Sequence, residues 1–271
     1  MAGKKTFYRI VYYLAPLIYL IALSTYTWLS LTLNSNPLWL LMNITVIYWF
    51  SIVFSLILTL IAVKAGLIQP INDGPVYAAL NEILIKAQIP TTKVQVLLRY
   101  PHSGYKSVTN AKVIGIKRYF LLIDATLITQ LQSDELKAII AHEIVHIKNN
   151  DVFKRYFFCA LVFILPLVLI TPAMIIQSSK LVTMMLIILT FVSSIGLFSF
   201  ALYQFRKMEY QADEIVVQIL GQPTSLIQAL SKLNTINGCK PKLSWIQRLF
   251  STHPDLEQRV NHLQRLCNMQ L

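Results

Sequence analysis

Residues 135–151 read ELKAIIAHEIVHIKNND, and the five residues HEIVH within this stretch decide how the rest of the chain is interpreted. His142 and His146 are four residues apart, so on a helix both lie on one face, one turn from each other. Two imidazoles in this arrangement can each offer a ring nitrogen to one Zn²⁺ ion at about 2.0 Å. Glu143 follows the first histidine, where its carboxylate could take a proton from a metal-bound water.

The composition is that of a membrane protein. The chain has 271 residues, of which 55% are hydrophobic and only 13% are charged, and its mean hydropathy is +0.57. A helix that crosses a bilayer needs about 20 apolar residues, and four uncharged runs are long enough: Ile10–Leu33, Leu38–Val63, Tyr156–Ser179 and Leu181–Phe205. None resembles a cleaved signal peptide, because the first run is too long and lacks a small-residue cleavage site.

The charged residues divide the chain into polar and apolar parts. All twelve acidic residues and all five histidines lie in two segments, 64–155 and 206–271. An even number of spans places both segments and both termini on one side of the membrane, and the excess of Lys and Arg predicts the cytoplasmic side. Contact with anionic lipid headgroups accounts for the net charge of +12. No aromatic and basic pattern suits the binding of bases, so nucleic acid is not expected as a partner.

The polar segments predict a mixed domain. A helix is expected over Pro75–Gln88, from apolar residues at helical spacing, and strands over VQVLLRY (94–100), KVIGI (112–116) and YFLLID (from 119). The last two strands are expected to form a hairpin. A helix capped by Ser133 carries HEIVH and is expected to run on towards the third span. The last 66 residues are predicted to be helical, with a break at GQP (221–223).

A catalytic zinc site needs a third protein ligand. Asp151 is disfavoured, because on a continuous helix it points about 140° away from His146. Glu209 and Asp213, four residues apart in FRKMEYQADE, are the better candidates. Glu209 could complete the site and Asp213 could fix the tautomer of a ligand histidine. The alternative is a solvated helix face on which Arg206 pairs with Glu209. Two antiparallel membrane helices would return the chain to the side it left, and so bring Glu209 back to HEIVH.

Three motifs in this order resemble one known group. HEIVH, EYQAD (209–213) and FSTHPDLEQRV (250–260) are similar to motifs of the HtpX family of membrane zinc metallopeptidases, which is related to the type I CAAX prenyl proteases. The resemblance covers nearly the whole chain. It implies an α-helical membrane protein with an α+β metallopeptidase domain of the gluzincin type. The expected divisions are a tail with two transmembrane helices (1–63), the first part of the catalytic domain (64–155), an inserted transmembrane hairpin (156–205) and the second part of the catalytic domain (206–271).

The resemblance also implies roles for single residues. One Zn²⁺ per chain is expected on His142, His146 and Glu209, with Glu143 as general base. The implied supporting and substrate residues are Asp213 next to a ligand histidine, Arg259 in the tail motif, His253 as oxyanion partner, and Asn110 with Ala111 on the edge strand along which an extended peptide would lie. His102 and His262 are not expected to be ligands.

The expected function is hydrolysis of peptide bonds at the cytoplasmic face of the cytoplasmic membrane. By the resemblance, the substrates would be misfolded or damaged membrane proteins, in protein quality control under stress. A CAAX-type processing protease is one alternative. A membrane sensor that keeps the zinc fold and cuts a single partner is another, and a non-enzymatic scaffold with an incidental HExxH motif is a third.

Overall fold

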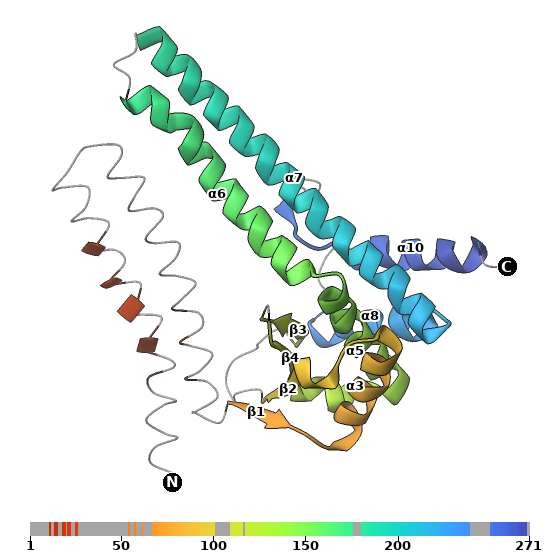
Figure 1. Ribbon diagram of the computed structural model, residues 1–271. Coiled ribbons are helices and arrows are strands. Elements are labelled where there is room, and N and C mark those ends of the chain that lie inside the picture. Colours follow the sequence, from red (N-terminus) through yellow and green to blue (C-terminus); the bar gives the residue numbers. More distant parts are fainter. Residues whose placement is uncertain are drawn as a thin grey trace. The chain divides into compact units, whose positions relative to one another are not determined.

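The computed structural model describes residues 67–100, 109–115, 117–175, 180–238 and 250–269, together with single helical positions between 11 and 61 (Figure 1). The first two predicted spans lie outside the described residues, apart from those positions. The chain divides into two compact units. One contains Met1–Gln69 and Phe163–Ser194, and the other contains Pro70–Val162 and Ile195–Leu271.

A four-stranded sheet has the order β1-β2-β4-β3, with bounds β1 (Ile68–Ile71), β2 (Val94–Arg99), β3 (Ala111–Ile114) and β4 (Tyr119–Asp124). β2 pairs with β4 in parallel, and β3 pairs with β4 in an antiparallel hairpin, as predicted. The hairpin turn depends on Gly115, whose φ is 105°, because a Cβ there would collide with the backbone of Arg118. Because β3 is the last strand in this order, it forms one edge of the sheet. The sequence did not predict β1.

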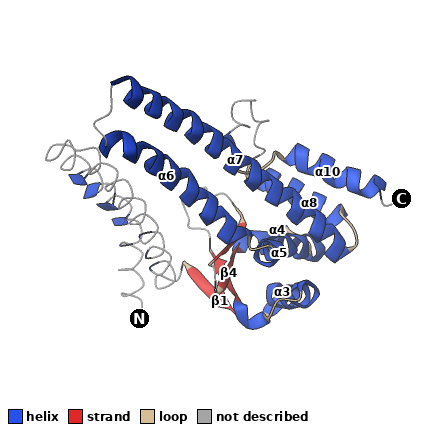
Figure 2. Ribbon diagram, turned by 45° about the horizontal axis from the view of Figure 1, so that its top comes forward, coloured by secondary structure: helices blue, strands red, loops and turns tan. Residues whose placement is uncertain are grey.

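Helices pack on the sheet (Figure 2). The helix predicted at 75–88 is α3 (Gly74–Ala87), and the HEIVH helix is α5 (Ser133–Lys148). A short helix α4 (Ala125–Gln130), which the sequence did not predict, follows β4. The core packs alternate residues of the strands against aliphatic residues of α3 and α5. Its members include Val96, Leu121 and Ile123 from the strands, Leu84 from α3 and Ile140 from α5. Burial of this apolar surface holds α5 firmly against the sheet.

The first turn of α5 is capped one residue earlier than predicted. Gln132, not Ser133, is the N-cap residue. Its backbone N–H donates to Glu135 Oε2 at 2.7 Å. The same carboxylate oxygen accepts from Lys232 Nζ at 2.8 Å, which ties α5 to α8 (Thr224–Ile236). A glutamate three residues after the cap can accept a hydrogen bond from the cap's own N–H, and this pairing favours Gln132 over Ser133 as the N-cap residue.

The end of α5 corrects a second prediction. The helix does not run on towards the third span. It ends at Lys148, and α6 (Asp151–Ile175) begins after two asparagines. Asn150 has a φ of 56°, a left-handed conformation that asparagine tolerates better than most residues. The chain therefore changes direction between the HEIVH helix and α6.

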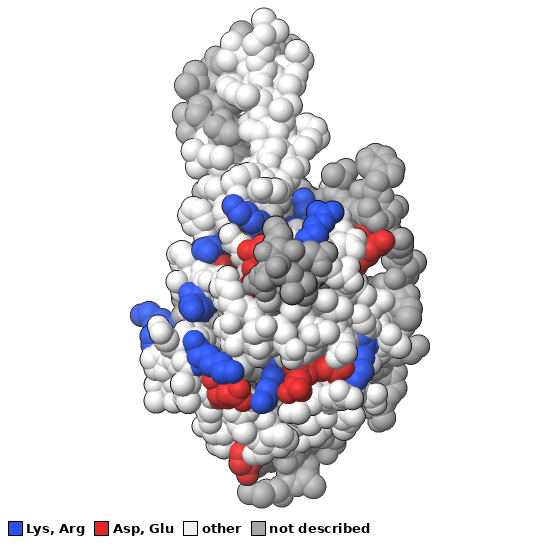
Figure 3. Space-filling model, turned by 90° about the vertical axis from the view of Figure 1, so that its right-hand side faces the viewer, with Lys and Arg blue, Asp and Glu red and all other residues white. Residues whose placement is uncertain are grey.

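The two long helices are α6 and α7 (Lys180–Leu220). Among the described residues, one helix is long and apolar enough to cross a membrane. It is α7 from Met184, with a hydropathy of 2.3 over its most apolar window. The predicted fourth span lies within α7 and the predicted third span covers most of α6, while the four-span arrangement stays a prediction. Figure 3 shows charged side chains on the unit that carries the sheet, and uncharged atoms along the described face of α6 and α7.

α7 passes from apolar residues into EYQAD without a break. Just before that motif, it packs against the first turns of α6. Ala201, Leu202, Phe205 and Met208 form this contact with Phe158 and its neighbours. After α7, the predicted break at GQP is confirmed: α8 follows, and α10 (Leu256–Met269) lies beyond residues 239–249, which are outside the described residues.

Candidate metal centre

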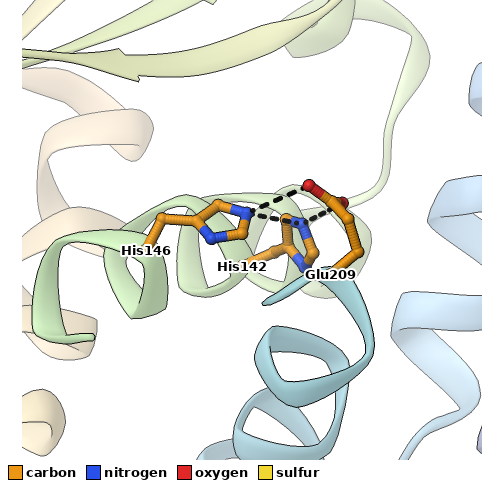
Figure 4. A group of neighbouring side chains, drawn as sticks. All are labelled: His142, His146 and Glu209. Atoms are coloured by element: carbon orange, nitrogen blue, oxygen red, sulfur yellow. Dashed lines mark hydrogen bonds and ion pairs between the residues drawn. The ribbon is translucent and has the colours of Figure 1, made fainter. Parts of the chain in front are cut away.

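Two helices bring three potential metal ligands together. His142 and His146 come from α5 and Glu209 comes from α7 (Figure 4). The two histidine Nε2 atoms are 3.2 Å apart. Glu209 Oε2 lies 3.3 Å from His142 Nε2, and Glu209 Oε1 lies 3.6 Å from His146 Nε2. The side chains are buried, with Glu209 only 2% exposed.

These separations fit one tetrahedral ion. Ligand atoms at about 2.0–2.1 Å from a tetrahedral zinc stand roughly 3.3 Å from one another. Each histidine nitrogen lies near a different oxygen of Glu209, and one ligand atom from each residue lies within 4.8 Å of the others, close enough to share one ion. An open fourth position is what a catalytic site requires. Burial also favours a shared ion, because in a site closed off from water the electrostatic attraction between the Glu209 carboxylate and a cation is only weakly screened.

A carboxylate orients each histidine from behind. His142 Nδ1 lies 3.0 Å from Asp213 Oδ1, and His146 Nδ1 lies 2.9 Å from Asp151 Oδ2. These two aspartates are 0% and 1% exposed. A hydrogen bond at Nδ1 leaves Nε2 free to bind a metal and makes it more basic. The predicted partner Asp213 and the unexpected partner Asp151 therefore occupy equivalent positions.

Arg259 closes the side of the site next to Asp213. Its guanidinium donates two hydrogen bonds to the Asp213 carboxylate, from Nε at 2.8 Å and from Nη2 at 2.6 Å. Arg259 Nη1 also lies 3.8 Å from Glu209 Oε2. A bidentate pair of this kind fixes the orientation of both side chains. Arg259 comes from α10, so the tail motif completes a site built on α5 and α7.

Glu143 lies beside the ligand group and touches the edge strand. Its Oε2 accepts a hydrogen bond from Val113 N at 3.1 Å. Burial raises the pKa of the Glu143 carboxyl above its ordinary value, although the charges of His146 and His142 act in the opposite direction. A carboxylate with a raised pKa is a better proton acceptor at neutral pH.

His142 has a shifted pKa of its own. Burial and the charge of Arg259 act to lower it, but hydrogen bonds with Asp213 and Glu209 outweigh them and raise the pKa of His142 to about 9. Without a metal, the imidazolium therefore compensates the charge of the surrounding carboxylates. Metal ligation requires the neutral ring, so a cation and this proton compete for the same place.

The two alternatives for the acidic residues can now be compared. Asp151 does not face away from His146, because the helix breaks at Asn150, yet it contacts Nδ1 of the histidine and not the ligand group. The solvated-face alternative for Glu209 and Asp213 is wrong, since both are buried. Arg206, which that alternative paired with Glu209, donates a hydrogen bond to Ser251 O at 3.0 Å.

His253 and Arg155 contact the same oxygen of Glu209. His253 Nδ1 lies 3.1 Å from Glu209 Oε1, and its side chain is 58% exposed. Arg155 Nη2, from α6, donates to Oε1 at 2.6 Å. Sequence reasoning missed Arg155, as it missed the contact of Asp151 with His146. The signal for both is NND (149–151), in which two asparagines mark a helix break that turns α6 back towards the site.

Asn110 and Ala111 lie where β3 begins, at the edge of the sheet. Asn110 N donates to Asp124 Oδ2 at 2.7 Å, and Asn110 Oδ1 accepts from Ala111 N at 2.9 Å. The preceding residue is held on both sides of its peptide: Thr109 N donates to Asn237 Oδ1 at 2.8 Å, and Asn237 Nδ2 donates to Thr109 O at 3.0 Å. Asn237, which sequence reasoning missed, thus anchors the start of this edge strand.

The remaining histidines are separate from the ligand group or outside the described residues. His262 Nε2 lies 2.9 Å from Glu214 Oε1. His102 falls outside the described residues.

Comparison with known proteins places the chain among peptidases. Residues 70–267 match the model of "Peptidase family M48". A relative named "Protease HtpX homolog" in Acaryochloris marina is 26% identical over 237 residues, which cover 77% of this chain and 78% of the relative. The relative of the same name in Thermococcus sibiricus is 24% identical over 252 residues, covering 81% and 82%.

A solved structure has a similar fold. The crystal structure of Ste24p from S. mikatae superposes with a TM-score of 0.59 at 20% sequence identity. The alignment covers 94% of this chain and 63% of Ste24p. The chain thus spans less than two thirds of the length of that protein.

Proposed function

This chain belongs to peptidase family M48, whose members are metallopeptidases, and from that premise we propose that it is a zinc-dependent endopeptidase of the cytoplasmic membrane. The observation that carries the proposal is the convergence of His142, His146 and Glu209 on one point, with Glu143 beside them. The matched region, 70–267, contains every residue of this group. One zinc ion per chain is proposed on the three ligands.

The bound zinc would polarise the scissile carbonyl and make water a stronger acid. Glu143 takes a proton from the attacking water and later delivers it to the leaving amine. The peptide lies extended along β3 near Asn110 and Ala111, where backbone groups at the sheet edge can pair with it. His253, partly exposed beside Glu209, donates a hydrogen bond to the oxyanion.

A cavity beside this edge is suited to a substrate side chain. Its volume is about 210 Å³, and apolar residues of α8 and α10 line it together with Asn110 and Arg259. Leu230 and Leu233 provide the apolar surface on the α8 side. Five of the nine lining residues are polar or charged: Thr109, Asn110, Asn234, Asn237 and Arg259. We therefore expect a substrate side chain with an apolar body and a hydrogen-bonding end to be preferred next to the cleaved bond, because such a side chain satisfies both parts of the lining.

The membrane setting is proposed from charge and from α7. All twelve acidic residues and 20 of the 24 basic residues lie in two segments that a hairpin of apolar helices would return to one side, and the excess of basic residues favours the cytoplasmic side. Glu209 lies four residues after Phe205, the last residue of the predicted fourth span, so the site stands close to the bilayer. Membrane proteins that are misfolded or damaged are the proposed substrates. The second candidate is a CAAX-type processing protease.

The test compares wild type with Glu143→Gln as full-length protein in detergent. Zinc content is measured by elemental analysis, and cleavage is measured on denatured casein and on the protein itself. We expect both proteins to hold about one zinc, with cleavage lost in Glu143→Gln. Unchanged cleavage would contradict the assignment of Glu143. Absence of zinc from the folded protein would favour a scaffold, and cleavage of one co-expressed regulator without casein hydrolysis would favour a sensor.

A further inference from the structure

A second cavity, separate from the ligand group, opens between the first turns of α6 and the middle of α7. Its volume is about 410 Å³. It is lined by aromatic, amide and basic side chains together with one methionine: Phe153, Lys154, Phe157, Phe158, Gln204, Lys207, Met208 and Gln211. All of them belong to the unit that carries the sheet.

The lining has two chemical parts. Lys154 and Lys207 contribute two ammonium groups, and no acidic residue lines the cavity among the described residues. Phe153 and Phe157, one helical turn apart, are 56% and 54% exposed and give the cavity its apolar part. A ligand that suits both parts carries a negative charge and has an apolar body.

The position of the cavity narrows the class of ligand. Lys154 lies two residues before Tyr156, where the predicted third span begins, and Lys207 lies two residues after Phe205, where the predicted fourth span ends. In the proposed membrane insertion, both lysines lie at the level of the lipid headgroups, and the cytoplasmic leaflet is the anionic one. Phe157, three residues farther towards the span than Lys154, then faces the upper part of the acyl chains, whereas Phe153 stays at the headgroup level.

We propose that this cavity binds one anionic phospholipid, with its phosphate between Lys154 and Lys207, near Phe153, and its acyl chains against Phe157. The proposal rests on the membrane insertion included in the proposed function. Charge complementarity selects an anionic lipid over a zwitterionic one, because a choline headgroup would place a further positive charge next to the two ammonium groups.

One lysine connects the cavity with the metal centre. Lys154 Nζ lies 3.2 Å from Asp151 Oδ1, and the other oxygen of that carboxylate contacts His146 Nδ1 at 2.9 Å. A phosphate that attracts Lys154 competes with Asp151 for the same ammonium group. The lipid thus influences how strongly Asp151 interacts with His146, without contacting the site itself.

The experiment measures lipid binding directly. Full-length protein in detergent is titrated with dioleoyl phosphatidylglycerol or dioleoyl phosphatidylcholine, and bound lipids are counted by native mass spectrometry. We expect one phosphatidylglycerol to bind more tightly than phosphatidylcholine. Lys154→Gln and Lys207→Gln should each weaken that binding about fivefold, since a basic residue near anionic lipid contributes about that factor. Lys207→Arg should keep it.

The control is Lys93→Gln, which removes the same charge at an exposed position on the short helix before β2. Three outcomes would overturn the proposal. The first is equal affinity of the protein for both lipids. The second is a loss of phosphatidylglycerol binding in Lys93→Gln as large as in the cavity variants, and the third is a double variant, Lys154→Gln/Lys207→Gln, that binds this lipid as well as wild type. Glycerol phosphate that binds as tightly as phosphatidylglycerol would also overturn it, because the site would then hold a free phosphate ester. Zinc content and casein cleavage are measured on the same samples, so failure of the peptidase assignment is seen separately from failure of lipid binding.

Discussion

Arg155 Nη2 lies 2.6 Å from Glu209 Oε1, so the proposed third zinc ligand is ion-paired with a residue of α6. The guanidinium also lies over the ring of Phe205, 5.5 Å from its centre. The arginine is thus fixed on one side by an aromatic face and on the other by the carboxylate. It holds Glu209 in the orientation that directs the carboxylate at the two histidines.

Replacement of Arg155 should therefore weaken metal binding. We expect Arg155→Ala to lower zinc affinity about tenfold, as is usual when the partner of a ligand is lost. Competition with a chromogenic chelator measures the affinity. Arg265→Ala, on the exposed face of α10, removes the same charge at a distance and should have no effect. Equal or tighter zinc binding by Arg155→Ala would show that the arginine competes with the ion and does not position its ligand.

Asp151 should matter for the affinity of the site although it is not a proposed ligand. Asp151→Ala removes the hydrogen-bond partner of His146 Nδ1, and we expect zinc affinity to fall about 10- to 100-fold. Asp151→Asn keeps a hydrogen-bond acceptor, so its zinc affinity should fall less. The same chelator competition gives both values. An unchanged affinity in Asp151→Ala would show that Asp151 serves only the first turn of α6 and does not support His146.

The backbone at Asn150 makes a prediction about stability. Its φ of 56° is strained for residues other than glycine and asparagine. Asn150→Ala should lower the free energy of unfolding by about 1 kcal/mol, while Asn150→Gly should change it little. Thermal unfolding in detergent, followed by circular dichroism, distinguishes the two. Equal melting temperatures for the two variants would show that this turn is not strained.

The pKa of His142 predicts how the metal-free protein responds to pH. Because its folded pKa is raised from 6.5 to about 9, the protonated ring stabilises the fold fully below pH 6.5, and this contribution is lost as pH rises to about 9 and beyond. We expect the melting temperature of EDTA-treated protein to fall across this range. Zinc-loaded protein should lack this fall, because the metal holds the neutral ring. The same decrease in both forms would assign it to another group.

The sequence was informative wherever a pattern repeats or a motif is local. Helical spacing gave the face shared by His142 and His146, alternation gave the β3–β4 hairpin, and GQP marked the end of α7. Glu209 and Asp213 could be paired with the histidines because four-residue spacing again places two side chains on one face.

The rest depends on contacts between segments far apart in sequence. Arg155 and Glu209 are separated by 54 residues, and nothing in the spacing of either signals the other. The capping of α5 by Gln132 depends on Glu135, which Lys232 also holds from α8. The direction of Asp151 depends on the backbone angle of one asparagine, which helical periodicity does not report. The contacts of Arg155 and Lys232 are long-range, whereas the cap at Gln132 and the turn at Asn150 are local features that helical periodicity does not encode.

The unbroken course of α7 has a mechanical consequence. After Gly196, α7 has no glycine or proline to act as a joint, and this part of the helix carries both the packing contact with α6 and Glu209. A rotation of this part about the helix axis turns the Glu209 carboxylate by the same angle. A change in how Phe205 and Met208 pack on α6 is therefore passed directly to the geometry of the candidate metal centre.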